Sequence, residues 1–292
     1  MAQAFHRLGS RVTLIQKDSQ ILPREDPQAA GLLSGVLERE GIRVMLETGI
    51  RQVRVSGSHK QARVEGASGK ETLETDEILV AAGRIPNVQG LNLEAAGVAY
   101  DPRIGVRVND YLQTTNKAVY AAGDVCFPYE FTHIADATAR IVIQNALFLR
   151  CRKHISLTIP WCTYTDPEIA HVGSCPKELD ARGVAHDTFV RDLKEVDRAI
   201  LDGEDEGLLK IHVKKGKDRI LGATLVAAHA GEMISQITQA MVSGTGLKRL
   251  NNVIHPYPTQ SEALRQTPSQ YYVRKFSPRL KRWLGCWFRW RR

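Results

Sequence analysis

The sequence has few cysteines and lacks the spacings that would join them in one site. The five cysteines, at positions 126, 151, 162, 175 and 286, form no C-x-x-C or C-x4-C pair. Structural zinc sites and local redox disulfides are usually built from such close pairs, so neither a metal site nor a local disulfide is predicted. The remaining interpretation is that they are idle thiols in a reducing cytoplasm.

Long apolar runs and acidic tail residues are also missing. No run approaches the roughly 18 apolar residues that a membrane-spanning helix needs. Residues 274–292 contain no Asp or Glu but eight of the 40 Lys and Arg. The other 32 Lys and Arg balance the 32 Asp and Glu, so the net charge of +8 lies in this segment alone. A neutral body argues against nucleic-acid binding by the folded part.

A glycine-rich phosphate-binding turn is missing as well. A nucleotide-binding βαβ unit needs a first strand and such a turn ahead of its first helix, so that helix amides can hold the pyrophosphate. Here the chain begins on a predicted helix, residues 1–9, which Gly9 closes, and no G-x-G-x-x-G precedes it. We therefore expect an incomplete nucleotide-binding unit, as if a segment ahead of it had been removed.

The residues that are present predict two domains, because 292 residues can bury two modest cores. After the first helix come a strand at 11–16, a helix at 26–41 and a strand at 42–47, with Asp26 as the helix cap and Gly41 as its end. This alternation indicates a parallel sheet with crossover helices. Three half-polar runs, at 51–57, 61–66 and 71–77, predict an antiparallel meander.

After about residue 77 the regular alternation of helices and strands ends. EILVAAGRIPN (77–87) and KAVYAAGDV (117–125) each predict a buried strand that ends in a glycine turn. A helix follows at 133–150, with inward candidates Ile134, Ala137, Ile141, Ile143 and Leu147. From about Ile159 the order is mixed and indicates an α+β domain. Its predicted elements are strands at 161–165, 188–193, 207–213 and 219–228 and a helix at 231–244.

Two of these stretches have the build of ligand-binding strand ends. In VYAAGDV (119–125) a glycine lets the backbone approach a ligand closely, and the carboxylate of Asp124 can accept hydrogen bonds from sugar-type hydroxyls. VAAGRIPN (80–87) stops at a glycine in the same way. Taken alone, each is equally an ordinary turn.

Four motifs nevertheless occur in the order of one known family. AAGRIPN (81–87) resembles the exit from the NAD(P)H domain of the flavin-dependent pyridine nucleotide–disulfide oxidoreductases, and TTNKAVYAAGDV (114–125) resembles their second FAD motif. YTDPEIAHVG (164–173) resembles the opening of their dimerisation domain. IHPYPTQSE (254–262) resembles the segment that each subunit inserts into its partner's active site. The resemblance covers nearly all of the chain.

The resemblance implies an α/β fold class. It comprises an incomplete Rossmann-type NAD(P)-binding domain and an FAD-domain remnant, followed by an α+β dimerisation domain. The implied boundaries are 1–88 for the NAD(P)-binding part, 89–158 for the carboxyl-terminal part of the FAD domain, 159–273 for dimerisation and 274–292 for a basic aromatic tail. The family's first FAD motif and its C-x4-C redox pair belong to a region ahead of this chain, so the isolated chain is expected to be inactive.

The resemblance also implies cofactor-binding residues. Asp124 would bind the ribityl chain of FAD, and the other residues expected at the flavin are Gly123, His133 and Ala135. Gly83 and Arg84 would border the two nucleotide domains. The strand at 11–16 ends at Gln16, followed by Lys17, where an acidic residue usually binds the ribose 2′-hydroxyl of NADH. This favours NADPH over NADH.

The expected catalytic residues lie in the 254–262 segment. Aligning its PTQSE with the family's P-T-x-x-E places Glu262 on the catalytic glutamate and Tyr257 where the disulfide reductases carry histidine, with His255 two residues earlier. A phenol with a pKa near 10 is a poor base at neutral pH, so thiol exchange is disfavoured. Mercuric-reductase-type members carry tyrosine at this place. The alternative is that Tyr257 only packs.

The tail, residues 276–292, combines aromatic and basic side chains. Leu280, Trp283, Leu284, Trp287 and Phe288 recur at helical spacing, and Arg279, Lys281, Arg282 and Arg289 occupy other faces. Such a helix suits the surface of an anionic membrane, on the inner face of the cell membrane, or alternatively docks on its own dimer.

The sequence thus predicts part of a homodimeric, mercuric-reductase-like enzyme that passes hydride from NAD(P)H to FAD and on to a cysteine pair outside this chain. The alternatives are a non-catalytic dimerisation or membrane-associated module and one half of a split enzyme. Mercuric ion, a disulfide and a quinone all stay open as substrates.

Overall fold

The computed structural model describes residues 1–67, 69–275 and 278–291, and their contacts divide the chain into two units. The larger unit combines Met1–Ile78 with Pro160–Arg292, and the smaller unit is Leu79–Ile159. The finer division, with breaks after residues 88, 158 and 273, stays a prediction.

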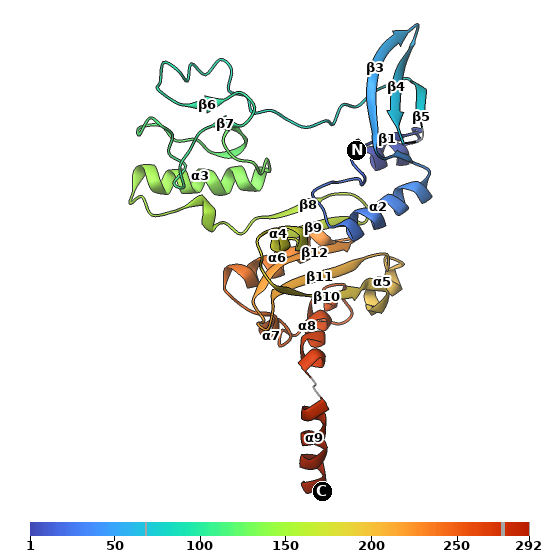
Figure 1. Ribbon diagram of the computed structural model, residues 1–292, viewed down its shortest axis with the longest axis vertical. Coiled ribbons are helices and arrows are strands. Elements are labelled where there is room, and N and C mark those ends of the chain that lie inside the picture. Colours follow the sequence, from blue (N-terminus) through green and yellow to red (C-terminus); the bar gives the residue numbers. More distant parts are fainter. Residues whose placement is uncertain (68, 276–277, 292) are drawn as a thin grey trace. The chain divides into compact units, whose positions relative to one another are not determined.

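The amino-terminal part of the larger unit alternates helices and strands, as its sequence pattern predicts. Its elements are α1 (Ala2–Arg7), β1 (Thr13–Ile15), α2 (Pro27–Glu40) and β2 (Arg43–Met45). β1 and β2 pair in parallel, and α2 connects them (Figure 1). The predicted parallel unit with a crossover helix is confirmed here.

Both ends of α2 are fixed by the residues that the sequence singles out. The Asp26 carboxylate accepts hydrogen bonds from the backbone amides of Gln28 (2.9 Å) and Ala29 (3.2 Å). These amides belong to the first turn, where no carbonyl of the helix can reach them. Gly41 ends the helix at φ 103°, a left-handed conformation that glycine adopts without steric cost.

The predicted meander is confirmed. Its three strands are antiparallel neighbours in the order β3 (Thr48–Ser56), β4 (His59–Gly66) and β5 (Gly69–Thr75). Most residues of β3 and β5 are exposed, and in β3 they include the apolar Ile50, Val53 and Val55 beside polar residues, in keeping with the half-polar runs of the sequence.

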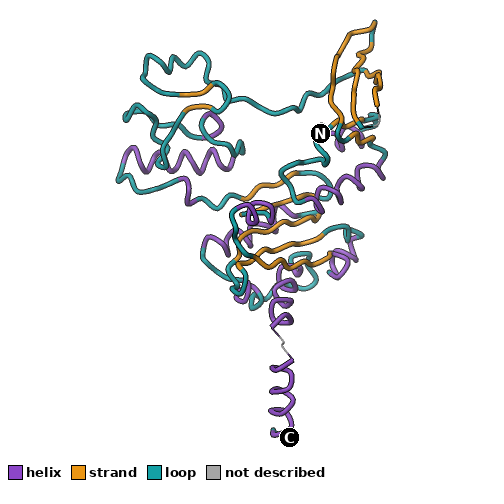
Figure 2. The backbone as a smooth tube through the Cα atoms, viewed as in Figure 1, coloured by secondary structure: helices purple, strands orange, loops and turns teal. Residues whose placement is uncertain are grey.

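A five-stranded antiparallel sheet is the centre of the larger unit (Figure 2). Its spatial order is β10–β11–β12–β9–β8, formed by β8 (Pro160–Thr163), β9 (Glu168–Gly173), β10 (His186–Asp192), β11 (Leu208–Lys214) and β12 (Ile220–Ala227). The sequence predicts four of these strands and misses β9. Most of β9 is buried on both faces, so its residues lack the polar–apolar alternation that marks a half-buried strand.

Helices cover both faces of this sheet. One face packs on α6 (Ala230–Val242), α7 (Leu247–Leu250) and α8 (Glu262–Lys275), which form the main core with alternate strand residues such as Leu209 and Ile211. The residues between them point to the opposite face, where Leu208 and Val226 pack with α2. The shorter helices of this part are α4 (Pro176–Ala181) and α5 (Asp197–Asp202), and the last helix is α9 (Pro278–Trp290).

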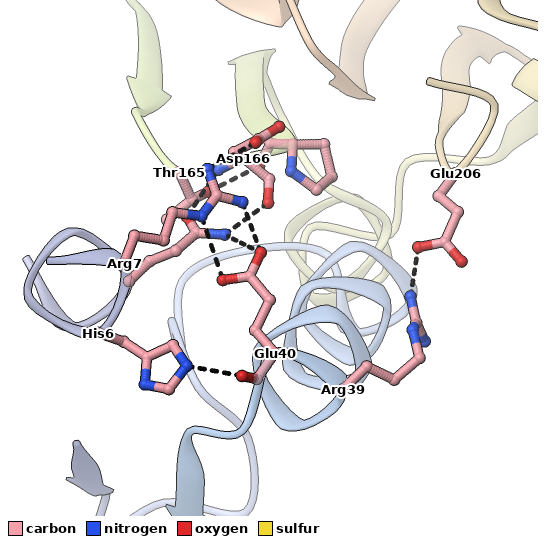
Figure 3. Close-up of polar contacts among 9 residues, drawn as sticks. His6, Arg7, Arg39, Glu40, Thr165, Asp166 and Glu206 are labelled. Carbon is pink, nitrogen blue, oxygen red and sulfur yellow. Dashed lines mark hydrogen bonds and ion pairs between the residues drawn. The ribbon is translucent and has the colours of Figure 1, made fainter. Parts of the chain in front are cut away.

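Polar contacts join the first helices to the loop ahead of β9 (Figure 3). The Arg7 guanidinium contacts Glu40 (2.5 Å) and Asp166 (2.7 Å), and Arg39 pairs with Glu206. The Glu40 carboxylate accepts hydrogen bonds from Arg7, which holds the pKa of that carboxyl below its usual value. Ion pairs that are accessible to solvent contribute little stability. The apolar packing of α2 therefore supplies most of the free energy that holds the first helices on the sheet.

The smaller unit has little regular structure apart from one long helix. It contains β6 (Tyr100–Asp101), β7 (Gly105–Val106), α3 (Thr132–Leu147) and two 3-10 turns, η1 (Gly123–Val125) and η2 (His154–Ser156). One apolar cluster of this unit is formed by three valines, Val88, Val98 and Val106, with half-buried neighbours. Leu112, Phe127, Ile134 and Ile141 are buried as well.

Two predictions for this unit are wrong. Residues 77–87 form no strand, and Leu79 and Val80 are exposed. Residues 117–125 form no strand either: their one β-bridge joins Tyr120 to Gln113, with a hydrogen bond on each side, from Thr114 N to the Val119 oxygen and from Ala121 N to the Leu112 oxygen. A strand needs a hydrogen-bonded neighbour along its length, and among the described residues neither segment has one. Both segments are therefore extended or turn-like rather than parts of a sheet.

The inward face of α3 is also narrower than predicted. Ile134 and Ile141 are buried and Ala137 is half-buried, but Ile143 and Leu147 are exposed. The core of this unit reaches only the first part of the helix, so apolar spacing alone overestimates what α3 buries here.

Candidate functional site

The 254–262 segment leads into α8 and presents two side chains to solvent. The Tyr257–Pro258 peptide bond is cis, and the Thr259 hydroxyl donates to the Pro256 carbonyl oxygen (2.8 Å). Ile254 is 93% exposed and Tyr257 is 70% exposed. The phenol of Tyr257 is therefore open to solvent at the end of this proline-rich run.

Within the described part of the chain, the Tyr257 hydroxyl bonds the Asp197 carboxylate at the start of α5. The hydroxyl donates to Asp197 Oδ2 at 3.0 Å. Because a phenolate could not donate this hydrogen bond and would repel the carboxylate, Asp197 raises the pKa of Tyr257 above its ordinary value. The phenol thus stays protonated at neutral pH and can act as a hydrogen-bond donor but not as a base.

Glu262, in contrast, is almost buried. It is 9% exposed, stands at the first turn of α8 and pairs with Arg265. Its backbone amide donates to the Thr259 carbonyl (3.2 Å). The phenol is thus bonded to Asp197 and the carboxylate to Arg265, rather than to each other.

His255 has contacts for both ring nitrogens. Nε2 lies 3.0 Å from Gln236 Oε1 on α6, and Nδ1 lies 3.3 Å from the Val253 carbonyl oxygen. The ring is half-buried and anchors the segment to α6. The structure therefore places the three predicted catalytic residues on one segment but exposes only Tyr257.

In the smaller unit, Gly123 lies where the 117–125 segment meets α3. Its φ is 72°, its amide donates to Thr138 Oγ1 (3.0 Å), and an added Cβ would lie 3.0 Å from the Ala135 Cβ. Glycine is required by both conformation and space. His133 lies on the first turn of α3, with its ring stacked on Phe131 at 5.4 Å.

Asp124 borders a cavity of about 310 Å³ in the same unit. Arg84 Nε contacts Glu130 Oε2 at 2.7 Å, and Arg84 Nη1 lies 3.9 Å from Asp124 Oδ2. Gly83 precedes this arginine in a left-handed conformation, φ 104°. The lining consists of Arg84, Ile85, Pro86, Asn87, Asp124, Val125 and Glu130. The two sequence motifs thus meet at one cavity, with an accessible carboxylate beside a guanidinium.

Gln16 and Lys17 follow β1 in the larger unit. The Gln16 side-chain oxygen accepts from the Asp18 amide (3.2 Å), and Lys17 is exposed. The end of this strand is therefore neutral at Gln16 and positive at Lys17.

Sequence reasoning missed a buried polar row across the face of the sheet opposite the main core. Trp161 Nε1 donates to Glu25 Oε1 (2.7 Å), and Thr224 and Thr188 bond to His171 and His212, each at 2.8 Å. Glu25 Oε2 and His212 Nε2 are buried with no hydrogen-bond partner among the described residues. A histidine between apolar residues in each of two strands, AHV and IHV, was the available signal.

Burial determines whether the acidic and imidazole side chains of this row are charged. It raises the pKa of Glu25, lowers that of His171, and lowers the pKa of His212 to about 4. Asp26 behaves differently. Burial opposes its charge, but the Lys210 ammonium at 2.7 Å keeps its pKa below the ordinary value. The row therefore holds neutral imidazoles beside one buried ion pair.

Comparison with known proteins identifies the family. Residues 1–139 match the family described as pyridine nucleotide-disulphide oxidoreductase, and residues 159–268 match the dimerisation domain of the same family. The chain belongs to the pyridine nucleotide–disulfide oxidoreductases, which are FAD-dependent oxidoreductases that use NAD(P)H. The predicted fold class is confirmed.

Relatives show the same assignment. A mercuric reductase of Streptomyces lividans is 36% identical over 264 residues, which are 90% of this chain and 56% of that protein. A dihydrolipoyl dehydrogenase of Thermus scotoductus is 36% identical over 268 residues, 90% of this chain and 57% of that protein. The HOCl-induced flavoprotein disulfide reductase RclA from Escherichia coli, solved as a Cu(II) complex, matches with a TM-score of 0.84 and 28% identity. The match covers 92% of this chain and 60% of that chain.

The chain therefore spans about half the length of the curated relatives it matches. Within the part of the chain that the structure describes, every helix is too short or too polar to cross a bilayer. All five cysteines lie in this part and are free.

Proposed function

We propose that this chain forms part of a homodimeric FAD-dependent oxidoreductase of the mercuric-reductase type. When bound, FAD in such an enzyme accepts hydride from NAD(P)H and passes electrons to a cysteine pair, which this chain does not contain. The contribution of this chain would be to hold parts of both cofactors and to place the 254–262 segment in the active site of a second copy. A reducing cytoplasm suits its free cysteines.

The observation that carries this proposal is the exposed, protonated phenol of Tyr257. Acid–base catalysis of thiol exchange needs a group that takes up and releases a proton near neutral pH. The Asp197 carboxylate raises the pKa of Tyr257 further above that range. Reduction of a soft metal ion held by thiolates requires no proton transfer from residue 257. A neutral hydroxyl at this position therefore suits a metal-ion substrate better than a disulfide. Glu262 and His255 would support the segment from within.

The residues around Asp124 fit the polyol part of FAD. An accessible carboxylate at the rim of the cavity can accept hydrogen bonds from hydroxyls, and Arg84 fixes its surroundings by bonding Glu130. Gly123 and Ala135 keep the backbone and α3 in close contact at this point, and His133 stands on the adjoining helical turn. We propose these four residues, Gly123, Asp124, His133 and Ala135, as the FAD contacts of this chain.

NADPH is the proposed hydride donor, with NADH as the alternative. The 2′-phosphate of NADPH is anionic, and Lys17 offers a cation directly after β1, whereas Gln16 supplies no carboxylate for a free 2′-hydroxyl. Gly83 and Arg84 would border the two nucleotide-binding domains.

A split enzyme is the second candidate, because the smaller unit exposes many large apolar side chains for its size. They are Leu79, Val80, Ile85, Leu91, Ile104, Ile143, Leu147, Phe148, Leu149 and Ile155. Exposed apolar surface of this extent usually marks an interface. A second polypeptide with the glycine-rich FAD motif and the cysteine pair would cover it.

The test is reconstitution. The chain would be purified alone and after co-expression with the region of the Streptomyces lividans mercuric reductase that lies outside the alignment. We expect a colourless protein alone and bound flavin, seen by its visible absorbance, after co-expression. Asp124→Asn should lower flavin retention, and Asp136→Asn, an exposed aspartate of α3, is the matched control. Stoichiometric flavin on the isolated chain would overturn the proposal, and so would equal flavin loss in both variants.

Reconstitution also distinguishes the substrates. The reconstituted enzyme should consume NADPH with mercuric ion in excess thiol and show little turnover with lipoamide or glutathione disulfide. A faster reaction with a disulfide or with a quinone would refute the mercuric assignment while leaving the family unchanged.

A further inference from the structure

The last helix, α9, has two chemically different faces. Leu280, Leu284 and Phe288 follow one another at intervals of four residues, and Trp283 and Trp287 lie beside them with stacked rings at 5.9 Å. Because residues three and four apart share one side of a helix, these side chains form a single apolar stripe. The side chains of Lys281, Arg282 and Arg289 are exposed on the remaining circumference. Residues 276, 277 and 292 of the predicted tail lie outside the described residues.

Most of the apolar stripe of α9 is exposed, whereas Leu284 is half-buried. Trp283 and Phe288 are each 60% exposed and Trp290 is 78% exposed. Tryptophan is the side chain most suited to a membrane–water interface, since its ring is apolar and its N–H can remain hydrated. Three of the four tryptophans of the chain lie in this one helix.

The positive charge of α9 indicates a negatively charged partner. Residues 274–292 contain no acidic side chain, whereas Lys and Arg balance Asp and Glu over the rest of the chain. A second copy of the chain has no excess of acid to meet these cations. An anionic lipid surface offers both an apolar layer for the stripe and phosphate groups for the cations.

The length of α9 determines its orientation relative to a bilayer. Thirteen residues at about 1.5 Å each give a helix of about 20 Å, shorter than the roughly 30 Å of a hydrocarbon core. We infer that α9 binds the surface of an anionic membrane, lying in its plane with the tryptophan stripe at the acyl boundary and the cations among the headgroups. The helix thereby makes the protein a peripheral membrane protein, independently of its redox reaction.

The inference is tested by flotation of the full chain with vesicles. The probes are phosphatidylcholine vesicles with and without phosphatidylglycerol. We expect binding to the anionic vesicles, weak binding to the neutral ones, release at high salt, and a blue shift of tryptophan fluorescence on binding. K281Q/R282Q/R289Q should weaken the partition coefficient by roughly fivefold for each cation removed.

Two further variants separate charge from position. W283A/W287A should abolish the fluorescence shift and most of the binding. K177Q/K194Q/K215Q removes the same charge from exposed lysines elsewhere in the larger unit and should bind like the unmodified chain. Equal binding by the tail variants and the control would refute the inference. Loss of the dimer in W283A/W287A, measured by sedimentation without vesicles, would show instead that α9 docks on a second copy, and retention on nucleic acid but not on anionic vesicles would likewise overturn it.

Discussion

The buried His212 makes acid stability a direct test of the larger unit. Its side chain is 0% exposed in the middle of β11, its Nδ1 bonds the Thr188 hydroxyl, and its Nε2 has no hydrogen-bond partner among the described residues. Burial of the imidazole, and next to it the neighbouring His171 and His186, disfavour the protonated form and lower its pKa to about 4. The native state must therefore keep this imidazole neutral.

The magnitude follows from linkage between folding and protonation. In the unfolded chain the imidazole takes up a proton near its ordinary pKa of 6.5, whereas the native chain does so near about 4. Between these values the unfolded state binds more protons, so the free energy of unfolding rises with pH and is lost as pH falls. The contribution of His212 is about 3 kcal/mol, complete above about pH 6.5 and lost towards about pH 4.

The assay is chemical denaturation of the full chain, followed by circular dichroism at several pH values between about 7 and about 4.5. His212→Gln cannot titrate, so its free energy of unfolding should fall less steeply with acid than that of the unmodified chain. The difference should approach 2–3 kcal/mol at the lowest pH, in keeping with about 1.4 kcal/mol per pKa unit. His59→Gln, at a half-exposed histidine of β4, is the matched control and should leave the slope unchanged. Parallel curves for His212→Gln and the unmodified chain would show that His212 is not the source, and the neutral-imidazole argument would then be wrong.

Three other substitutions test separate parts of the structure. Lys210→Met leaves the Asp26 carboxylate buried without its cation and should cost about 3–5 kcal/mol of unfolding free energy by denaturation, while Lys214→Met, at an exposed position, should cost little. Gly123→Ala should destabilise the smaller unit by at least about 1–2 kcal/mol, seen as faster hydrogen exchange around α3, because its φ of 72° is left-handed and the new Cβ meets Ala135. In the reconstituted enzyme, Tyr257→Phe should lower kcat by about 10²-fold, the usual loss when one transition-state donor is removed, with an unchanged melting temperature. Tyr164→Phe, at another exposed tyrosine, should retain full activity.

Local signals explain why the larger unit could be predicted from sequence. The cap of α2 needs only Asp26 and the two amides that follow it, and the stop at Gly41 needs only one left-handed residue. The meander follows from alternation within short runs. These features depend on residues close in sequence, where propensity and periodicity carry the information.

The features that sequence reasoning missed depend on distant residues. Glu25 and Trp161 are 136 residues apart in the sequence, and the bond between Tyr257 and Asp197 joins α5 to a remote loop. No local sequence pattern predicts either contact. The family motif predicted that residue 257 matters, but the partner that raises its pKa is visible only in three dimensions.

The two missing strands have a different cause, and it bears on function. EILVAAG and VYAAG have the composition of buried strands, yet Leu79 and Val80 are exposed and Tyr120 takes part only in a single bridge. In the split enzyme proposed above, both segments would become strands of a sheet that a second polypeptide completes. The smaller unit also exposes Leu147 at the end of α3 and Phe148 in the loop after it. One covering segment would therefore complete the sheet, bury this apolar surface and bring the flavin motif to Asp124, so formation of the flavin site and folding of the smaller unit should occur together on reconstitution.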